Sequence, residues 1–395
     1  MSRLHIYDRR ERALVSAADR VLSVAAAVTR PLRRRRQPLE PRRILLLRLE
    51  RIGDLLMALP AIADVRALAP AAEIDLVVGS WNADLAGAMA PVTRVATLDA
   101  AWLARDGGGL GLPSLVRAAR QRRRARYDLA INFEPDIRSN LLLAASGAAW
   151  TVGYRSGGGG ALLDVALDYD TRAHTTDNAR RLVATVFGGS PFSETGRILV
   201  VPPEAHARAA RLLPAMRGPL AVVHVSGGRA IKQWEPDRFA DVARRLIAAS
   251  NATIVLTGST GDRPLVDRVK RALPAASVID AAGDLDLLTV AAILERVDLL
   301  ITGDTGPMHL AVAVGTPVVA VFGPSEPARY GPRGPHDRVV RVDLPCSPCN
   351  RIRLPPARCV GHTPDCLALV SADSAFTAAM SVLEGSRHSA RTSTA

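Results

Sequence analysis

Short apolar runs alternate with longer amphipathic stretches along most of the chain. An apolar run of about four to eight residues that ends in a turn is typical of a buried strand, and apolar positions that recur every three or four residues are typical of a helix. The expected strands are residues 43–49, 73–79, 92–98 and 127–133, then 220–225, 253–256, 297–302 and 317–322. The expected helices include residues 55–68, 115–126, 236–249, 262–273, 285–296 and 308–314. This alternation predicts an α/β fold built on parallel, doubly wound sheets.

The alternation breaks in the proline-rich and glycine-rich stretch between residues 200 and 218. A chain of 395 residues is long enough for two domains, so we expect the domain junction in this stretch. The expected parts are an extension (1–40), an N-terminal domain (41–205), a C-terminal domain (206–385) and a disordered tail (386–395).

One turn in the second half of the chain has the pattern of a ligand site. The strand 297–302 ends at Gly303-Asp304-Thr305-Gly306-Pro307, and a helix follows from Met308. The free N–H groups at such a helix start can hold a phosphate, whereas the carboxylate of Asp304 suits a hydroxyl-rich group such as a sugar. We expect Asp304, Thr305 and His309 to face one pocket at the carboxyl end of the strand. In the alternative interpretation, Asp304 or Thr305 only caps the helix.

Two further turns of the same half carry small residues that let backbone amides approach a ligand. The first follows residue 225 and contains Ser226, Gly227 and Lys232, whose charge could help to neutralise a pyrophosphate. In the alternative interpretation, Lys232 is only a surface residue. The second contains Gly258 and Asp262, which could meet ribose hydroxyls or simply begin a helix. The first turn is not a P-loop, because the G-x-x-x-x-G-K-[ST] spacing is absent. No turn has the G-x-G-x-x-G spacing, which weighs against a dinucleotide-dependent dehydrogenase.

In the first half, the strand 43–49 leads into Glu50-Arg51-Ile52-Gly53-Asp54 and then a helix. Asp54 therefore lies near a helix start at the carboxyl end of a strand. At this position its simplest role is to complement the positive end of the helix dipole, which is a frequent arrangement.

Charge is unevenly distributed along the chain, whose formal net charge is +13. Residues 1–43 hold twelve arginines against four acidic residues, an excess of eight positive charges. Within this part, an apolar stripe at helical spacing precedes four arginines, Arg33–Arg36; the stripe consists of Leu14, Ala18, Val21, Ala25 and Val28. This pattern favours a helix that lies on an anionic membrane surface over a nucleic-acid binder, because no aromatic residues interleave with the arginines. The alternative is a helix packed on the body of the protein.

The chain contains no run of about 18 uncharged apolar residues and no pattern of a cleaved signal peptide. We therefore expect a cytoplasmic protein. All four cysteines lie within Cys346–Cys366, in the spacing Cys346-x₂-Cys349-x₉-Cys359-x₆-Cys366. This cluster could hold a structural zinc ion, or the proline-rich segment could be a metal-free loop.

Together these motifs resemble glycosyltransferase family 9, the bacterial heptosyltransferases of lipopolysaccharide core assembly. The resemblance rests on Arg51-Ile52-Gly53-Asp54, on Lys232-Gln233-Trp234-Glu235-Pro236, and above all on the segment from Gly303 to His309. It implies a GT-B fold, in which two Rossmann-like domains face each other across a cleft. It also implies an inverting, metal-independent transfer, typically from ADP-heptose to a lipid-linked glycan acceptor, with no further cofactor.

By this resemblance, Asp54 is the general base and Lys232 contacts the pyrophosphate. Asp304, Thr305, Gly306 and His309 correspond to the donor site, and Asp262 matches an acidic position of the nucleotide region. The chain departs from some members in having Glu50 and Arg51 before the Gly-Asp pair, and Ser226-Gly227-Gly228 in the turn before Lys232. These departures leave the exact sugar and acceptor open, and with them a transferase for another nucleotide sugar. A non-catalytic membrane-associated binding protein on the same fold is a further alternative, against which the presence of Asp54, Lys232 and the Asp304–His309 turn argues.

Overall fold

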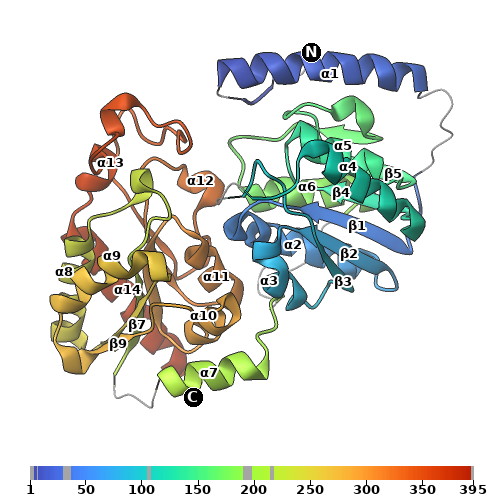
Figure 1. Cartoon of the computed structure of the whole chain (residues 1–395). Helices are drawn as coiled ribbons and strands as arrows, with labels where there is room; N and C mark the ends of the chain where they lie inside the picture. The colour runs from blue at the N-terminus through green and yellow to red at the C-terminus, as the bar shows by residue number, and fades with distance from the viewer. Residues whose placement is uncertain are drawn as a thin grey trace. The chain divides into compact units, whose positions relative to one another are not determined.

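The computed structural model describes residues 4–6, 8–29, 37–104, 108–189, 198–213 and 218–392. The chain divides into two compact units, Met1–Ile198 and Leu199–Ala395 (Figure 1). The boundary lies ahead of residue 205, where the first domain was expected to end. The reason is helix α7 (Pro203–Leu212), which buries Ala205 and Ala209 and packs with α10 of the second unit.

The first unit contains a sheet of six parallel strands in the order β3-β2-β1-β4-β5-β6. Their bounds are β1 (Arg43–Arg48), β2 (Glu73–Val78), β3 (Arg94–Thr97), β4 (Leu129–Asn132), β5 (Trp150–Tyr154) and β6 (Val165–Leu167). The central strands β1 and β4 are almost entirely buried. Helices cover parallel strands on both faces, which is why these strands read as continuous apolar runs.

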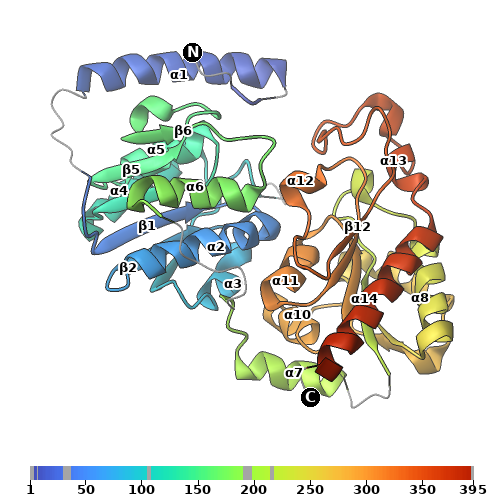
Figure 2. The same cartoon turned by 180° about the vertical axis from the view of Figure 1, so that it is seen from behind.

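The helices of the first unit are α1 (Arg9–Thr29), α2 (Ile52–Leu68), α3 (Ala83–Gly87), α4 (Leu112–Gln121), α5 (Ile137–Ala145) and α6 (Thr175–Phe187). Helices α2 and α6 lie side by side (Figure 2), joined by the ion pair of Asp64 and Arg180 at 2.9 Å. Helices α4 and α5 pack together, and their apolar residues share a core cluster with Leu45 and Leu47 of β1.

The second unit repeats this plan with the strand order β12-β11-β10-β7-β8-β9. Its strands are β7 (Leu220–His224), β8 (Thr253–Thr257), β9 (Val278–Asp280), β10 (Leu299–Gly303), β11 (Val318–Val321) and β12 (Arg338–Val340). Besides α7, its helices are α8 (Pro236–Ser250), α9 (Arg263–Arg271), α10 (Leu287–Leu294), α11 (Gly306–Val314), α12 (Pro327–Tyr330), α13 (Asp365–Ala368) and α14 (Ala372–Thr392). Helices α8, α9 and α14 share one apolar core with β7. The backbone of α14 is helical beyond residue 385, where a tail was expected to begin.

In both sheets the first and fourth strands of the unit are neighbours, and the chain continues from them toward opposite edges of the sheet. Loops that leave such a pair of strands diverge at their carboxyl ends and open a crevice there, which is where open α/β sheets bind ligands. The candidate sites are therefore the end of β1 and β4 in the first unit and the end of β7 and β10 in the second.

Helix α1 packs on the first unit through a face other than its predicted apolar stripe. Its Asp19 carboxylate accepts a hydrogen bond of 2.6 Å from the Gly159 amide, and Val15 lies against Gly158. The stripe points away from this contact, with Leu14 73%, Val21 69% and Val28 70% exposed. The expected arginine cluster at residues 33–36 lies outside the described residues. Within the described part of the chain, no helix is long and apolar enough to cross a membrane.

Candidate functional site

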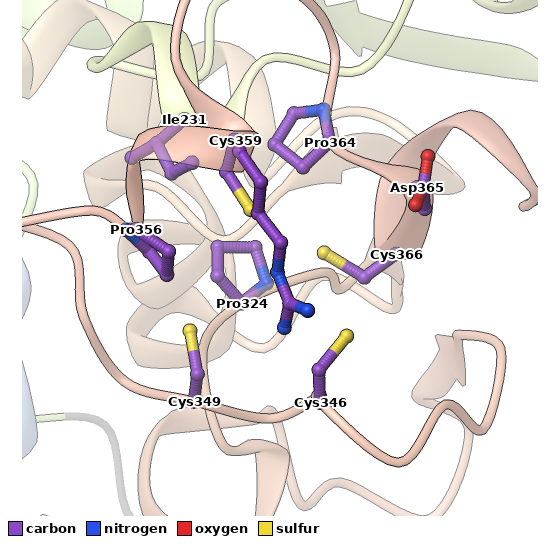
Figure 3. A pocket seen from close by; sticks show the side chains of 10 residues that line it. Ile231, Pro324, Cys346, Cys349, Pro356, Cys359, Pro364, Asp365 and Cys366 are labelled. Atoms are coloured by element: carbon purple, nitrogen blue, oxygen red, sulfur yellow. The ribbon is translucent and has the colours of Figure 1, made fainter.

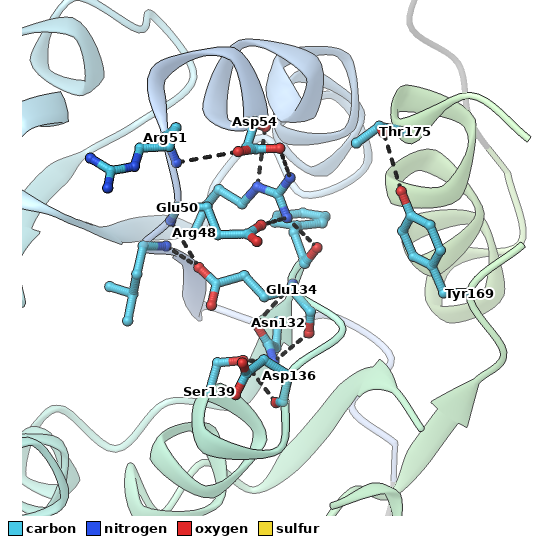
Figure 4. Close-up of polar contacts among 12 residues, drawn as sticks. Arg48, Glu50, Arg51, Asp54, Asn132, Glu134, Asp136, Ser139, Tyr169 and Thr175 are labelled. Atoms are coloured by element: carbon cyan, nitrogen blue, oxygen red, sulfur yellow. Dashed lines mark hydrogen bonds and ion pairs between the residues drawn. The ribbon is translucent and has the colours of Figure 1, made fainter. Parts of the chain in front are cut away.

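The first candidate site is a group of four charged side chains at the ends of β1 and β4, shown in Figure 4 and named here the carboxylate cluster: Arg48, Glu50, Asp54 and Glu134. Arg48 is the last residue of β1, and Glu50 and Asp54 follow it in the turn and first turn of α2. Glu134 follows β4. Because β1 and β4 are parallel neighbours, residues that follow them meet at one edge of the sheet.

The guanidinium of Arg48 is buried at the centre of this cluster. It lies 2.9 Å from the Glu50 carboxylate and 3.5 Å from the Asp54 carboxylate. It also donates to the backbone carbonyl oxygens of Asp54 (3.1 Å) and Phe133 (2.5 Å). Arg48 therefore holds the turn that carries Asp54 against the end of β4.

Glu134 and Glu50 titrate closer to neutral pH than ordinary carboxyl groups. Glu134 accepts hydrogen bonds from the amides of Leu49 and Glu50, yet burial raises its pKa to about 7. Burial likewise raises the pKa of Glu50 to about 8, although Arg48 opposes the shift. Three carboxyl groups share one guanidinium, so the cluster retains a proton near neutral pH.

Asp54 occupies the third position of α2 and does cap the helix start, since its Oδ2 accepts a hydrogen bond of 3.3 Å from the Arg51 amide. Its other oxygen faces Arg48. The side chain keeps 30% of its surface exposed, which leaves the carboxylate within reach of a hydroxyl from solvent. The capping role is thus present, and the role as a base stays a prediction.

The second candidate site begins with the turn after β7. Gly227 allows this turn to fold tightly, because a Cβ there would lie 2.7 Å from backbone atoms of Lys232 and Gln233. The Gln233 side chain accepts from the Gly227 amide at 2.7 Å and donates to the carbonyl oxygen of Val225 at 2.8 Å. These bonds fix the short helical turn η5 (Ala230–Lys232) over the end of β7.

Lys232 points to the end of the neighbouring strand β10, where its ammonium group lies 3.1 Å from the Asp304 carboxylate and also donates to the Asp304 carbonyl oxygen. Burial would raise the pKa of Asp304, but the charge of Lys232, a hydrogen bond from Ser325 and the charge of His309 together lower it. Asp304 therefore pairs with a cation and does not cap α11, so the capping alternative is wrong for this residue.

Thr305 is the N-cap residue of α11, without a side-chain cap bond, and its hydroxyl instead lies 3.1 Å from that of Thr302. Gly306 is the first residue of α11.

The turn after β8 brings Asp262 to the edge of this second site. Its carboxylate accepts from the amide (2.8 Å) and hydroxyl (2.6 Å) of Ser259. Burial would raise the pKa of Asp262, but hydrogen bonds from Ser259 and Ser226 lower it, so Ser226 and Asp262 are in contact. Gly258 lies beneath the same side chain, where a Cβ would come within 3.1 Å of the Asp262 Cβ. The structure thus brings Ser226, Gly258 and Asp262 together.

Ser325, Arg48 and Glu134 are site residues that the sequence analysis missed. Ser325 follows β11 and is buried beside Asp304. The only available signal was their position at the end of an apolar strand or a few residues after it, which many residues share.

The four cysteines of the C-terminal segment are free thiols that line one cavity of the second unit. In the present arrangement, no three His, Cys, Asp or Glu side chains of the described residues stand close enough together to hold a metal ion.

Comparison with known proteins identifies the family. The model of glycosyltransferase family 9 (heptosyltransferase) matches residues 115–356, more than half of the chain. The chain belongs to this family. It is 24% identical over 308 residues to the lipopolysaccharide core heptosyltransferase OpsX of Haemophilus influenzae, an alignment that covers 76% of this chain and 85% of OpsX.

Solved structures of the family have the same fold. The E. coli ADP-heptose lipopolysaccharide heptosyltransferase II matches with a TM-score of 0.70 at 20% identity, covering 87% of this chain and 99% of that one. A family 9 glycosyltransferase from Veillonella parvula matches with a TM-score of 0.72 at 22% identity, covering 87% and 98%. The predicted family, the GT-B fold class and the glycosyltransferase activity are therefore confirmed.

Proposed function

We propose that this glycosyltransferase moves a heptose from ADP-heptose to a hydroxyl of a lipopolysaccharide core or a related surface glycan, with inversion at the anomeric carbon. The observation that carries the proposal is the Lys232–Asp304 pair at the carboxyl ends of β7 and β10, where a sheet of this topology binds its ligand. The similarity to OpsX supports heptose and lipopolysaccharide as the sugar and acceptor classes. The similar structure from E. coli is that of an ADP-heptose lipopolysaccharide heptosyltransferase, which supports ADP-heptose as the donor.

In the proposed reaction, the second unit binds the donor. Lys232 and the amides at the start of α11 stabilise the negative charge that develops on the departing nucleoside diphosphate. Asp304 holds Lys232 in place and, with Thr305 and His309, meets the sugar. Ser226, Gly227, Gly258 and Asp262 approach the nucleotide, Asp262 through the ribose. Lys232 supplies the positive charge that a metal ion provides in other transferases.

The first unit provides the base. Asp54 accepts the proton of the acceptor hydroxyl as that hydroxyl attacks the anomeric carbon, a single displacement that inverts the configuration. The proton held in the carboxylate cluster by Glu50 and Glu134 limits the negative charge around Asp54, and Arg48, which lies 3.5 Å from the Asp54 carboxylate, orients that carboxylate.

We also propose that the enzyme works at the inner face of the inner membrane, on a lipid-linked acceptor. The exposed stripe of α1 supports this, because four large aliphatic side chains on one helix are 67–73% exposed: Leu14, Val21, Val24 and Val28. The arginines of residues 1–43 give the same region a positive charge that suits anionic lipids.

A transfer assay with the purified full chain tests the function. ADP-heptose and a heptose-deficient lipopolysaccharide core should give a product heavier by one heptose, detected by mass spectrometry. Asp54→Asn should bind ADP normally and transfer at least about a hundredfold more slowly, as expected for loss of a general base. Asp84→Asn is the matched control, because Asp84 also lies in the first turn of a helix but is exposed and outside the cluster.

Ligand screening by thermal shift separates the two leading donor classes. Stabilisation by ADP and ADP-heptose supports the proposal, since a ligand of the native state raises apparent stability. Stabilisation by UDP- or GDP-sugars without an effect of ADP-heptose would replace it with transfer of another sugar. No product with any donor, despite donor binding, would favour the non-catalytic alternative.

A further inference from the structure

The cysteine segment of the second unit encloses a small cavity that the proposed reaction does not use. Four cysteines line it, and we name them the cysteine cluster: Cys346, Cys349, Cys359 and Cys366. The cavity has a volume of about 40 Å³, and its other lining residues are Ile231, Pro324, Pro356, Arg358, Pro364 and Asp365. Figure 3 shows the four cysteine side chains arranged around the cavity that these residues line.

The chain around the cysteine cluster has little regular structure to hold it in place. Between β12 and α14, the only helical turns are η8 (Ala357–Cys359) and the four-residue α13. Connections of this length without regular structure are uncommon in compact domains unless something else orders them. Exposed apolar side chains such as Leu354 and Val360 do not supply a core for the segment.

Four thiols around one space are the donor set of a tetrahedral thiolate site. Cysteine is the ligand that zinc and iron share in such sites, and a pair separated by two residues, as in Cys346 and Cys349, is the usual spacing of one half of the site. A disulfide framework is the competing use of four cysteines, but all four are free in this structure.

We propose that the cysteine cluster binds one thiophilic divalent metal ion, zinc or ferrous iron, as a tetrahedral thiolate site. Binding releases the thiol protons to solvent and involves no change of oxidation state. Since no three ligands stand at binding distance in the described residues, the sulfur atoms must draw together around the ion. A cysteine sulfur moves by rotation about a single torsion, χ1, so this closure needs rotamer changes and small shifts of an irregular segment.

The position of the cavity gives the metal site a consequence for the donor site of the same unit. Ile231 lines the cavity and directly precedes Lys232 in η5. Pro324 also lines it and directly precedes Ser325, which hydrogen bonds to Asp304. Two backbone hydrogen bonds connect the cysteine segment to the loop after β11 that contains Pro324 and Ser325. The amides of Cys349 (3.0 Å) and Asn350 (2.7 Å) donate to the Pro324 carbonyl oxygen. A metal ion in the cysteine cluster would therefore order both loops that hold the Lys232–Asp304 pair.

Metal analysis of the full chain, purified under reducing and anaerobic conditions, tests the site without reference to transfer activity. We expect about one ion of zinc or iron per chain by plasma mass spectrometry, and Co²⁺ substitution should give the absorption bands of a tetrahedral thiolate complex. Cys349→Ser and Cys359→Ser should each lower the bound metal at least about tenfold. Leu354→Ala, an exposed change in the same segment, should retain it.

The wild-type protein alone can overturn the proposal, even where a cysteine variant fails to fold. Wild type that is metal-free as purified and takes up neither Zn²⁺ nor Fe²⁺ after reduction would overturn it. A mass two hydrogens lower per cysteine pair, which marks a disulfide, would also overturn it.

The consequence for the donor site rests on the proposed function and is measured separately. Removal of the metal by a chelator should weaken ADP binding several-fold in calorimetry while the protein remains folded by circular dichroism. If metal is bound but ADP affinity is unchanged by its removal, the cysteine cluster is a metal site without influence on the donor site. If no nucleotide binds at all, the proposed function is wrong. The measured number of metal ions per chain still tests the metal site independently.

Discussion

Replacing Lys232 by methionine tests the central contact of the second unit. Lys232→Met keeps the length of the side chain and removes its charge, so Asp304 loses its cation. The two side chains are only 19% and 11% exposed, which makes this a largely buried pair and not a surface one. Removing one partner of a fully buried pair costs about 3–5 kcal/mol. Asp304 keeps the Ser325 hydrogen bond and the charge of His309, so we expect a smaller loss of about 2 kcal/mol in the free energy of unfolding.

The pH dependence of this loss follows from the lowered pKa of Asp304. In the wild type, Lys232 helps to hold that pKa below the ordinary value of 3.8, so the pair stabilises the fold at pH values above about 4. This stability disappears as the pH falls through the pKa of the folded state. The difference between Lys232→Met and wild type should therefore be complete at pH 7 and should shrink below about pH 4.

The assay is urea unfolding at several pH values together with calorimetric titration of ADP. Because Lys232 is proposed to contact the pyrophosphate, the variant should bind ADP about ten- to a hundredfold more weakly, the usual range for a charged hydrogen bond. Lys270 is the only other lysine in the sequence and offers a matched control. It pairs with Asp280 at 2.8 Å but is 48% exposed, so Lys270→Met should cost less than about 1 kcal/mol and leave ADP binding unchanged. If the two variants behave alike in both measurements, the assignment of Lys232 is refuted.

Three further predictions concern the first unit. Asp54→Asn should lose less than about 1 kcal/mol in the free energy of unfolding, as expected for a carboxylate at a helix start, while transfer slows at least about a hundredfold. If the variant loses stability but keeps its turnover, Asp54 only caps the helix. Val21→Glu, on the exposed stripe of α1, should abolish sedimentation with anionic liposomes without changing the melting temperature. The control Val200→Glu changes an exposed valine outside α1 and should sediment with the liposomes as the wild type does. Equal sedimentation of the two variants would exclude membrane contact through this face of α1. Burial raises the pKa of Glu134 from an ordinary 4.5 to about 7 in the folded state. Between these pH values the folded state binds more protons than the unfolded state, so the stability of the wild type should fall as the pH rises from about 5 to 8. Glu134→Gln should flatten this slope, and an unchanged slope would mean that Glu134 does not titrate there.

The local sequence predicted most of the central sheet in each unit. Strands β1, β4 and β7 lie within the expected runs, and β10 extends one residue beyond its run, to Gly303. These strands were predictable because a parallel strand covered on both faces must be apolar throughout. Three of the four edge strands, β6, β9 and β12, were missed, because each has three residues and is partly exposed, so that its composition carries little signal. The edge strand β3 was predicted, and the inner strand β5 was missed as well. The candidate site residues lie in turns that follow strands of the two sheets, so turn chemistry was enough to single them out, and their roles stay predictions.

Which of the candidate site residues contact one another was decided by the tertiary structure. Lys232 and Asp304 are far apart in the sequence and come into contact only because β7 and β10 are neighbouring strands. Arg48 and Glu134 come together for the same reason, because β1 and β4 are neighbours. That adjacency decided that Asp304 pairs with a lysine instead of capping its helix, and it revealed Ser325 beside the pair. The same holds for α1: periodicity predicted its apolar stripe, but only packing could show that another face contacts the unit and leaves the stripe exposed. Periodicity and turn residues are local properties of a chain, whereas burial, pairing and pKa depend on which strands lie side by side, and many strand orders are compatible with one local pattern.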